Sequence, residues 1–358
     1  EFTFGQDRLK ELIDKLGYPF LGGNVFDTEW DEPVFESTAF FEKGGVSIAV
    51  IGQHFPYTPI ANPSYMVNGW SFGIRPEVLQ KNVNKAKKQG AEIVVLLSHN
   101  GFDVDQKLAS MIDGIDVILT GHTHDAIPKG IRIKDTLLLS SGSHGKYLGR
   151  IDLKVKNGKV VDTSSNLIPV FSDIIPPDPD MTKLINKIRA PYQSECNRVI
   201  GETETLLYRR GNFNGSWDDV ICDTIIRERD TEISLSPGFR WGTTLLPGQK
   251  ITIDDIYSQT SMNYPEVYRI EMTGKMIKEI LEDVCDNIFN PDPFFQQGGD
   301  MVRVGGLTYT CRPKNKMGNR ISNLRMISSD KPLESNKNYV VGGWGSVNLN
   351  VKGPPIYN

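Results

Sequence analysis

The stretch Gly114-Ile115-Asp116-Val117-Ile118-Leu119-Thr120-Gly121-His122-Thr123-His124-Asp125 joins a mostly apolar run to a pair of histidines. A short apolar run that ends at a glycine is typical of a buried strand that opens into a loop. Neutral imidazole is the commonest transition-metal ligand of proteins. The stretch therefore predicts a strand followed directly by a metal site. The alternative is that both histidines are ordinary turn residues.

The same pattern occurs upstream, in Ala91-Glu92-Ile93-Val94-Val95-Leu96-Leu97-Ser98-His99-Asn100-Gly101. In α/β sheets the binding crevices lie beyond the carboxyl ends of the strands, so two such strands would bring their histidines to one edge. The recurrence favours a shared site and makes His99, His122 and His124 candidate metal ligands. For His54 and His144 two interpretations stay open, as loop residues or as partners that orient the ligands.

The bulk composition is that of a globular protein with two domains. The chain has 358 residues, more than one hydrophobic core usually serves. It contains no apolar run near the roughly 20 residues that span a bilayer, so no membrane segment is expected. A formal net charge of -4 argues against nucleic acid as the main partner. The four cysteines form no CxxC pair, which disfavours a thiolate zinc site and leaves isolated thiols or one or two disulfides as alternatives.

The first half of the chain alternates between helical and strand patterns. Helices are expected over 6–16, 76–88 and 104–113, strands over 45–52, 91–99, 114–120 and 136–141, and a hairpin around Asn157-Gly158. The proline cluster at 175–180 marks a domain boundary. We expect a first domain over 1–175, a linker over 176–199 with one helix from Met181 to about Asn197, and a mixed second domain over 200–358.

Three loops of the second half combine glycines with aromatic and charged residues, at 209–217, 236–242 and 296–303. Glycine lets a backbone approach a ligand closely, which makes these segments candidate site loops. Arg240, between Phe239 and Trp241, would offer a planar guanidinium group to an oxyanion. The alternative is a surface arginine for Arg240 and a turn aspartate for Asp300.

The SHNG motif at 98–101 and the GHTHD motif at 121–125 resemble those of the calcineurin-like metallophosphoesterases, in the two-domain branch that includes the 5'-nucleotidases. The segments GQHFPYTPIANP (52–63), GFRWGTTLLPG (238–248) and GGDMVRVGG (298–306) resemble the SoxB-type thiosulfohydrolases. The resemblance covers essentially the whole chain. It implies an α/β fold, with a metallophosphoesterase-type β-sandwich flanked by helices, whose amino-terminal part lies outside this sequence, and a second mixed α/β substrate domain.

The resemblance also implies a site. His99 and His122 would bind one metal ion and His124 the other, and two Mn²⁺ ions are the expected cofactors. In the family, further ligands precede the segment that begins at Glu1, so this segment by itself is expected to be inactive. Arg240 and Asp300 would be catalytic. Residues implied in substrate binding are Asn214, Trp217, Arg240 and Arg303.

The activity implied is the release of sulfate from a cysteine S-sulfonate on the carboxy-terminal arm of the SoxYZ carrier protein, by dimetal-activated water, in the periplasm. One alternative is a 5'-nucleotidase-like phosphomonoesterase. It would need aromatic rings to stack on a base, and Met262-Asn263 stand where nucleotidases carry Pro-Phe. A third reading, from another class, is a catalytically inactive module that binds the carrier.

Overall fold

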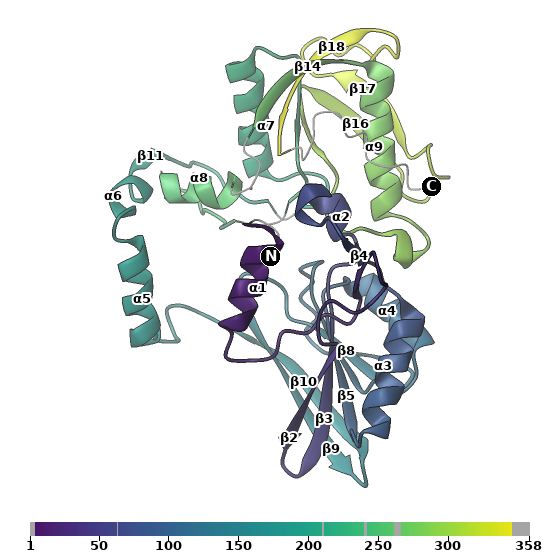
Figure 1. Cartoon of the computed structure of the whole chain (residues 1–358). Coiled ribbons are helices and arrows are strands. Elements are labelled where there is room, and N and C mark those ends of the chain that lie inside the picture. The colour runs from purple at the N-terminus through teal and green to yellow at the C-terminus, as the bar shows by residue number, and fades with distance from the viewer. Residues whose placement is uncertain (1–3, 63, 210, 240–241, 261–265, 346–358) are drawn as a thin grey trace. The chain divides into compact units, whose positions relative to one another are not determined.

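The apolar runs of the first half form the parallel centre of a six-stranded sheet. In this computed structural model, which describes residues 4–62, 64–209, 211–239, 242–260 and 266–345, each central strand runs parallel to the next and the two edge strands are antiparallel (Figure 1). In sheet order the strands are β2 (Thr38–Lys43), β3 (Val46–Gln53), β5 (Ile93–Ser98), β6 (Val117–Thr120), β8 (Thr136–Ser140) and β7 (Ile131–Ile133). The four predicted strands are confirmed.

Two amphipathic helices pack against this sheet, α3 (Pro76–Lys88) and α4 (Phe102–Met111). Pro76 occupies the first turn of α3, where a missing N–H costs no helical hydrogen bond. Leu79 of α3 and Leu108 of α4 are buried in one cluster with residues of β3, β5, β6 and β8. The predicted helices are therefore confirmed, and they fix the sheet whose strand ends carry the histidines.

Smaller elements complete the first part of the chain. They are α1 (Gly5–Asp14), β1 (Val25–Asp27), α2 (Thr58–Ala61), the 3-10 turn η2 (Ser64–Met66), β4 (Trp70–Phe72), β9 (Tyr147–Lys156) and β10 (Lys159–Pro169). Strands β9 and β10 form the predicted hairpin. Asn157 and Gly158 have φ of 52° and 68°, the left-handed values that a two-residue type I′ turn requires.

The helix expected from Met181 to about Asn197 is two helices, so that prediction is wrong in its continuity. α5 (Pro179–Arg189) ends just before Pro191, and α6 (Gln193–Cys196) begins after it. Proline lacks the N–H that would continue the helical ladder and its ring clashes with the preceding turn. The start of α5 is capped by Asp178, whose carboxylate accepts a hydrogen bond from Met181 N at 2.8 Å.

The second half contains a four-stranded mixed sheet with a helix on each face (Figure 1). Ile233 and Val341 point into the cluster that includes α9, whereas the small residues Ser234 and Gly342 point toward α7. A Cβ atom at Gly342 would lie 2.6 Å from Ile225 of α7, so glycine is what permits this close helix. The sheet order is β14 (Val267–Thr273), β18 (Asn338–Trp344), β12 (Ile233–Ser236) and β15 (Arg303–Gly305).

The remaining elements are α7 (Ser216–Arg229), α8 (Ile253–Thr260), α9 (Gly274–Ile288), the 3-10 turn η3 (Pro293–Phe295), and the strand pairs β11 (Val199–Glu202) with β13 (Lys250–Thr252) and β16 (Leu307–Cys311) with β17 (Ile321–Met326).

The chain divides into two units, residues 1–171 with 292–294 and residues 172–291 with 295–358. The predicted α/β class with a second mixed domain is confirmed. Within the described residues, no helix has the length and apolar character of a membrane span.

Candidate functional site

The carboxyl ends of the central strands bring two predicted ligands together. The parallel register aligns Gln53, Ser98 and Thr120 in one row. His99 follows Ser98, and its N–H donates to the carbonyl of Gln53 at 3.0 Å. His122 lies two residues after Thr120, the last residue of β6, and its ring centroid lies 5.3 Å from that of His99. The sheet register, together with two short loops, therefore places the two imidazoles side by side.

The GHTHD loop has an unusual backbone. His122 and His124 have φ of 76° and 59°, in the left-handed region that side chains other than glycine rarely adopt. Such strain persists where surrounding contacts determine it, and it is frequent at functional sites. Phe55 stacks on His122 with ring centroids 4.0 Å apart. The ring centroid of the third candidate, His124, lies 5.9 Å from that of His144. For His144 the sequence allows two interpretations, as a loop residue or as a partner that orients the ligands.

A buried polar network lies behind His99. The Ser98 hydroxyl donates to Asp105 Oδ1 at 2.9 Å, and Asn100 Nδ2 donates to the same oxygen at 3.1 Å and to Gln53 Oε1 at 2.6 Å. Asp105 and Asn100 are buried. Burial raises the pKa of the Asp105 carboxyl to about 6, against the opposing effects of Thr120, Ser98 and Asn100. The network fixes the backbone on both sides of His99, and sequence reasoning missed it because Asp105 reads as a helix residue.

The histidine pair fits a divalent cation in part. Two imidazoles whose centroids are 5.3 Å apart are close enough to share one ion at about 2 Å from each nitrogen. Within the described ranges, no cluster of three or more His, Cys, Asp or Glu side chains is arranged to hold a metal ion. His99 and His122 would thus provide two ligands of one ion. The assignment of His124 to a second ion stays a prediction.

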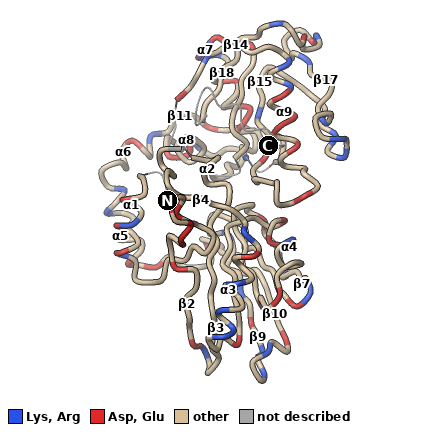
Figure 2. The backbone as a smooth tube through the Cα atoms, turned by 45° about the vertical axis from the view of Figure 1, so that its right-hand side comes forward, with Lys and Arg blue, Asp and Glu red and all other residues tan. Residues whose placement is uncertain are grey.

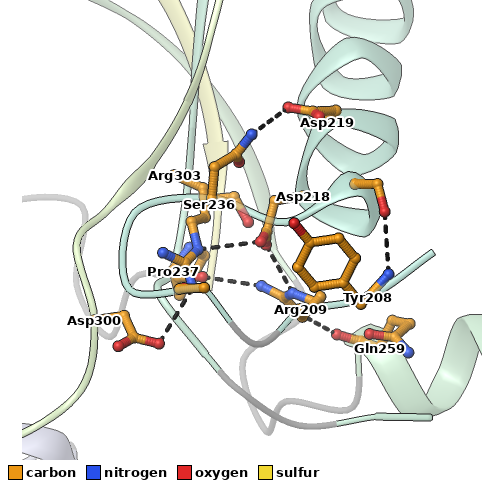
Figure 3. Close-up of polar contacts among 12 residues, drawn as sticks. Tyr208, Arg209, Asp218, Asp219, Ser236, Pro237, Gln259, Asp300 and Arg303 are labelled. Carbon is orange, nitrogen blue, oxygen red and sulfur yellow. Dashed lines mark hydrogen bonds and ion pairs between the residues drawn. The ribbon is translucent and has the colours of Figure 1, made fainter. Parts of the chain in front are cut away.

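In the second half, four charged side chains form a buried cluster at the ends of β12 and β15 (Figure 3). Asp218 lies in the first turn of α7. One of its carboxylate oxygens accepts a hydrogen bond from Arg209 Nε at 2.7 Å, and the other lies 3.1 Å from Arg303 Nε. Arg303 also pairs with Asp300 at 3.2 Å. Burial raises the pKa of the Asp218 carboxyl and lowers that of Arg209, while their mutual attraction opposes both changes.

This cluster ties together the three loops that the sequence singled out. Arg209 donates to the carbonyl of Pro237 at 3.0 Å, and Arg303 donates to that of Gly211 at 2.6 Å. Arg303 Nη1 is buried and finds no hydrogen-bond partner among the described residues.

Figure 2 shows basic and acidic residues interspersed along the chain, in keeping with the net charge of -4. An anion at these loops would therefore be recognised by local arginines and not by a basic face.

The other predicted binding residues occupy different settings. Trp217 is 1% exposed and packs with Leu207 and Leu245 in a small hydrophobic cluster. Asn214 is exposed, and its amide donates to Asp219 at 2.7 Å. Arg240, Met262 and Asn263 lie outside the described residues. The binding roles of Asn214, Trp217 and Arg303 and the catalytic role of Asp300 stay predictions.

Comparison with known proteins gives the family of the chain. Residues 199–345 match the model of the 5'-nucleotidase C-terminal domain. The structure of the sulfate thiohydrolase SoxB from Thermus thermophilus superposes with a TM-score of 0.93 at 36% identity, over 100% of this chain and 67% of that one. The chain belongs to the SoxB-type family. This places it in the 5'-nucleotidase branch of the metallophosphoesterases, whose members are hydrolases.

Two further relatives mark the breadth of the branch. A 5'-nucleotidase precursor from Thermus thermophilus shares the fold, with a TM-score of 0.80, 21% identity and coverage of 96% of this chain and 72% of that one. The uncharacterized metallophosphoesterase YunD of Bacillus subtilis is 33% identical over 43% of this chain. The chain spans less than two thirds of the length of several of its curated relatives, with 32% in the case of YunD.

Proposed function

We propose that this chain is part of a thiosulfohydrolase that releases sulfate from a cysteine S-sulfonate. The observation that carries the proposal is the likeness to SoxB, at 36% identity over 100% of the chain. The histidine pair His99 and His122 supports it, because two imidazoles at strand ends suit a site for divalent cations. The coarser activity, that of a hydrolase of the metallophosphoesterase type, follows from the family.

In this proposal the residues of the chain have separate tasks. His99 and His122 would hold one cation, His124 would bind a second, and Mn²⁺ is the expected metal. When bound, such a pair supplies Lewis-acid chemistry and an activated water nucleophile. Phe55, stacked on His122, would hold the orientation of its ring. The network of Asp105 would keep His99 in place.

The sulfonate group of the substrate would be recognised by arginines. Sulfonate oxygens accept charge-assisted hydrogen bonds, and the planar guanidinium group offers two parallel donors. Arg240 is proposed for this contact. Arg303 would hold the loops in place, because its Nη2 donates to the carbonyl of Gly211 at 2.6 Å, while Asp300 balances its charge at 3.2 Å. The proposed substrate carrier is the arm of SoxYZ, and the proposed location is the periplasm.

One observation favours the second candidate, a nucleotide phosphomonoesterase. Phe213 and Phe289 stack with ring centroids 6.2 Å apart and planes inclined by 20°. An aromatic pair is what a base-binding site requires. A base held between two rings needs about 7 Å or more, however, from two contact distances of 3.5–4.0 Å. The two rings instead lie close to each other, so we place this function second.

The decisive experiment compares two substrates on the enzyme that contains this chain, loaded with Mn²⁺. Sulfate release from an S-sulfonated SoxYZ carrier is measured beside phosphate release from nucleoside monophosphates. We expect kcat/KM for the sulfonate to exceed that for every nucleotide. A preference for a nucleotide would contradict the proposal. Carrier binding without release of either product would favour the inactive module.

An arginine variant tests how the substrate is held. Arg240→Ala should lower kcat/KM for the sulfonate by about tenfold to a hundredfold, because a charge-assisted contact contributes roughly 1.5–3 kcal/mol. Arg132→Ala, which removes an exposed arginine of β7, is the matched control and should retain full turnover. Equal rates in the two variants would refute the role of Arg240.

A further inference from the structure

Two cysteines of the second unit lie with their sulfur atoms in contact. Cys285 is buried in the C-terminal half of α9, and Cys311 is the last residue of β16. Their Sγ atoms are 3.2 Å apart. Because a disulfide bond is about 2.0 Å long, closing it requires an approach of only about 1.2 Å, which small side-chain rotations provide. The two residues are therefore placed for a covalent link.

Polar contacts hold the two backbones in this arrangement. Glu282, one turn before Cys285, accepts hydrogen bonds from the backbone N–H groups of Arg320 at 2.8 Å and Ile321 at 3.0 Å. Ile321 is the pairing partner of Cys311 in the β16–β17 hairpin. Arg320 in turn donates to the carbonyl of Cys285 at 3.2 Å. The closeness of the two sulfurs thus follows from several independent contacts and not from one rotamer.

The other two cysteines are placed differently. Cys222 is buried in α7, the helix on the opposite face of the sheet, and burial raises the pKa of its thiol to about 12. Cys196 is the last residue of α6. Neither belongs to the hydrophobic cluster of the second unit that contains Cys285 and packs against Cys311. The four thiols of the chain therefore divide into one close pair and two separate residues.

We propose that Cys285 and Cys311 form a disulfide that links α9 to β16. The two residues are 26 positions apart, and the segment between them carries Asp300 and Arg303. A bond at this position would close that segment into a loop and restrict the unfolded chain. The loop that contributes to the buried charge cluster would then be anchored covalently at both of its ends.

The oxidation requires a disulfide oxidant, such as oxidised glutathione. One cysteine thiolate attacks the oxidant to form a mixed disulfide and release one glutathione thiol; the second thiolate then displaces the other. The cysteine pair loses two protons and two electrons, and the oxidant leaves as two thiols. Burial raises the pKa of the Cys285 thiol in the folded protein, so the exchange is expected during folding, while both thiols are accessible.

Peptide mapping tests the pairing directly. The full chain is unfolded in urea with reductant, refolded in a mixture of oxidised and reduced glutathione, alkylated under denaturing conditions and analysed by mass spectrometry. We expect one linked peptide pair that contains Cys285 and Cys311, with Cys196 and Cys222 alkylated. Recovery of all four cysteines in alkylated form, or a link through Cys196 or Cys222, would overturn the proposal.

Thermal unfolding gives a second, independent readout. Reduction of the oxidised wild type should lower Tm by roughly 5 to 10 °C. Cys311→Ser should lack this reductant-dependent shift, whereas the matched control Cys196→Ser should keep it. A shift in Cys311→Ser as large as in the wild type would contradict the assignment. If Cys311→Ser fails to fold, the peptide map of the wild type still decides.

Discussion

Asp105 lies behind the histidine pair with its carboxyl group removed from water. Its Oδ1 accepts two hydrogen bonds, from Ser98 at 2.9 Å and from Asn100 at 3.1 Å. Its other carboxylate oxygen, Oδ2, is buried. A carboxylate in this setting is costly to ionise, which is why burial raises its pKa to about 6.

This pKa predicts a pH dependence of stability. Between about pH 4 and 6 the folded protein keeps a proton on Asp105 that the unfolded chain has released, so the free energy of unfolding falls as the pH rises. The loss amounts to roughly 3 kcal/mol and levels off above pH 6. Asp105→Asn should remove this pH-dependent loss, and urea unfolding from pH 4 to 7.5 measures the free energy of unfolding that shows it. The exposed Asp113→Asn is the control, and equal slopes in wild type and Asp105→Asn would contradict the prediction.

Asp218 provides a second test at the residue scale. Its carboxylate faces two buried arginines, Arg209 at 2.7 Å and Arg303 at 3.1 Å. Asp218→Asn would leave two buried positive charges with one counter-charge and should lower the free energy of unfolding by about 3 kcal/mol. The exposed neighbour Asp219→Asn should change it by less than about 0.5 kcal/mol. Chemical denaturation compares the two, and a small effect at Asp218 would show that the cluster contributes little to stability.

At the scale of elements, α7 depends on small residues in the strands beneath it. Gly342→Ala would place a methyl group 2.6 Å from Ile225 and should destabilise the second unit by about 1–3 kcal/mol. Gly201→Ala is the matched control in a strand, because a Cβ atom there meets nothing within 4 Å. Thermal unfolding of the two variants measures the difference. An unchanged Tm for Gly342→Ala would mean that α7 moves away at no cost.

Elements with strong periodicity could be predicted from the sequence, and contacts between distant residues could not. The strand that ends at Ser98 and the helix that begins at Pro76 follow from local patterns. Pro191 is a local signal for a helix break, but the helical spacing of the residues around it predicts one continuous helix. The pairing of Asp218 with Arg303 has no such signal, because it depends on α7 packing beside β15. The closeness of His99 and His122 could be predicted, because each follows an apolar run typical of a strand and parallel strands end at the same edge of a sheet.

At the scale of the whole molecule, each of the two units carries one part of the proposed chemistry. The first unit presents the histidine pair at the carboxyl ends of β5 and β6. The second presents the buried arginines at the ends of β12 and β15. This division predicts that metal binding and substrate recognition can be damaged separately. Variants of the histidines should lose metal, and variants of the arginine cluster should keep it.

Metal binding by His99 and His122 is tested most directly by the Mn²⁺ affinity of the enzyme that contains this chain, measured by titration calorimetry with elemental analysis. His99→Ala and His122→Ala should each weaken binding at least tenfold, because each removes an imidazole ligand. Asp218→Asn, in the other unit, should bind as the wild type does. Unchanged affinity in both histidine variants would contradict the proposed metal site, since the two imidazoles would then hold no cation.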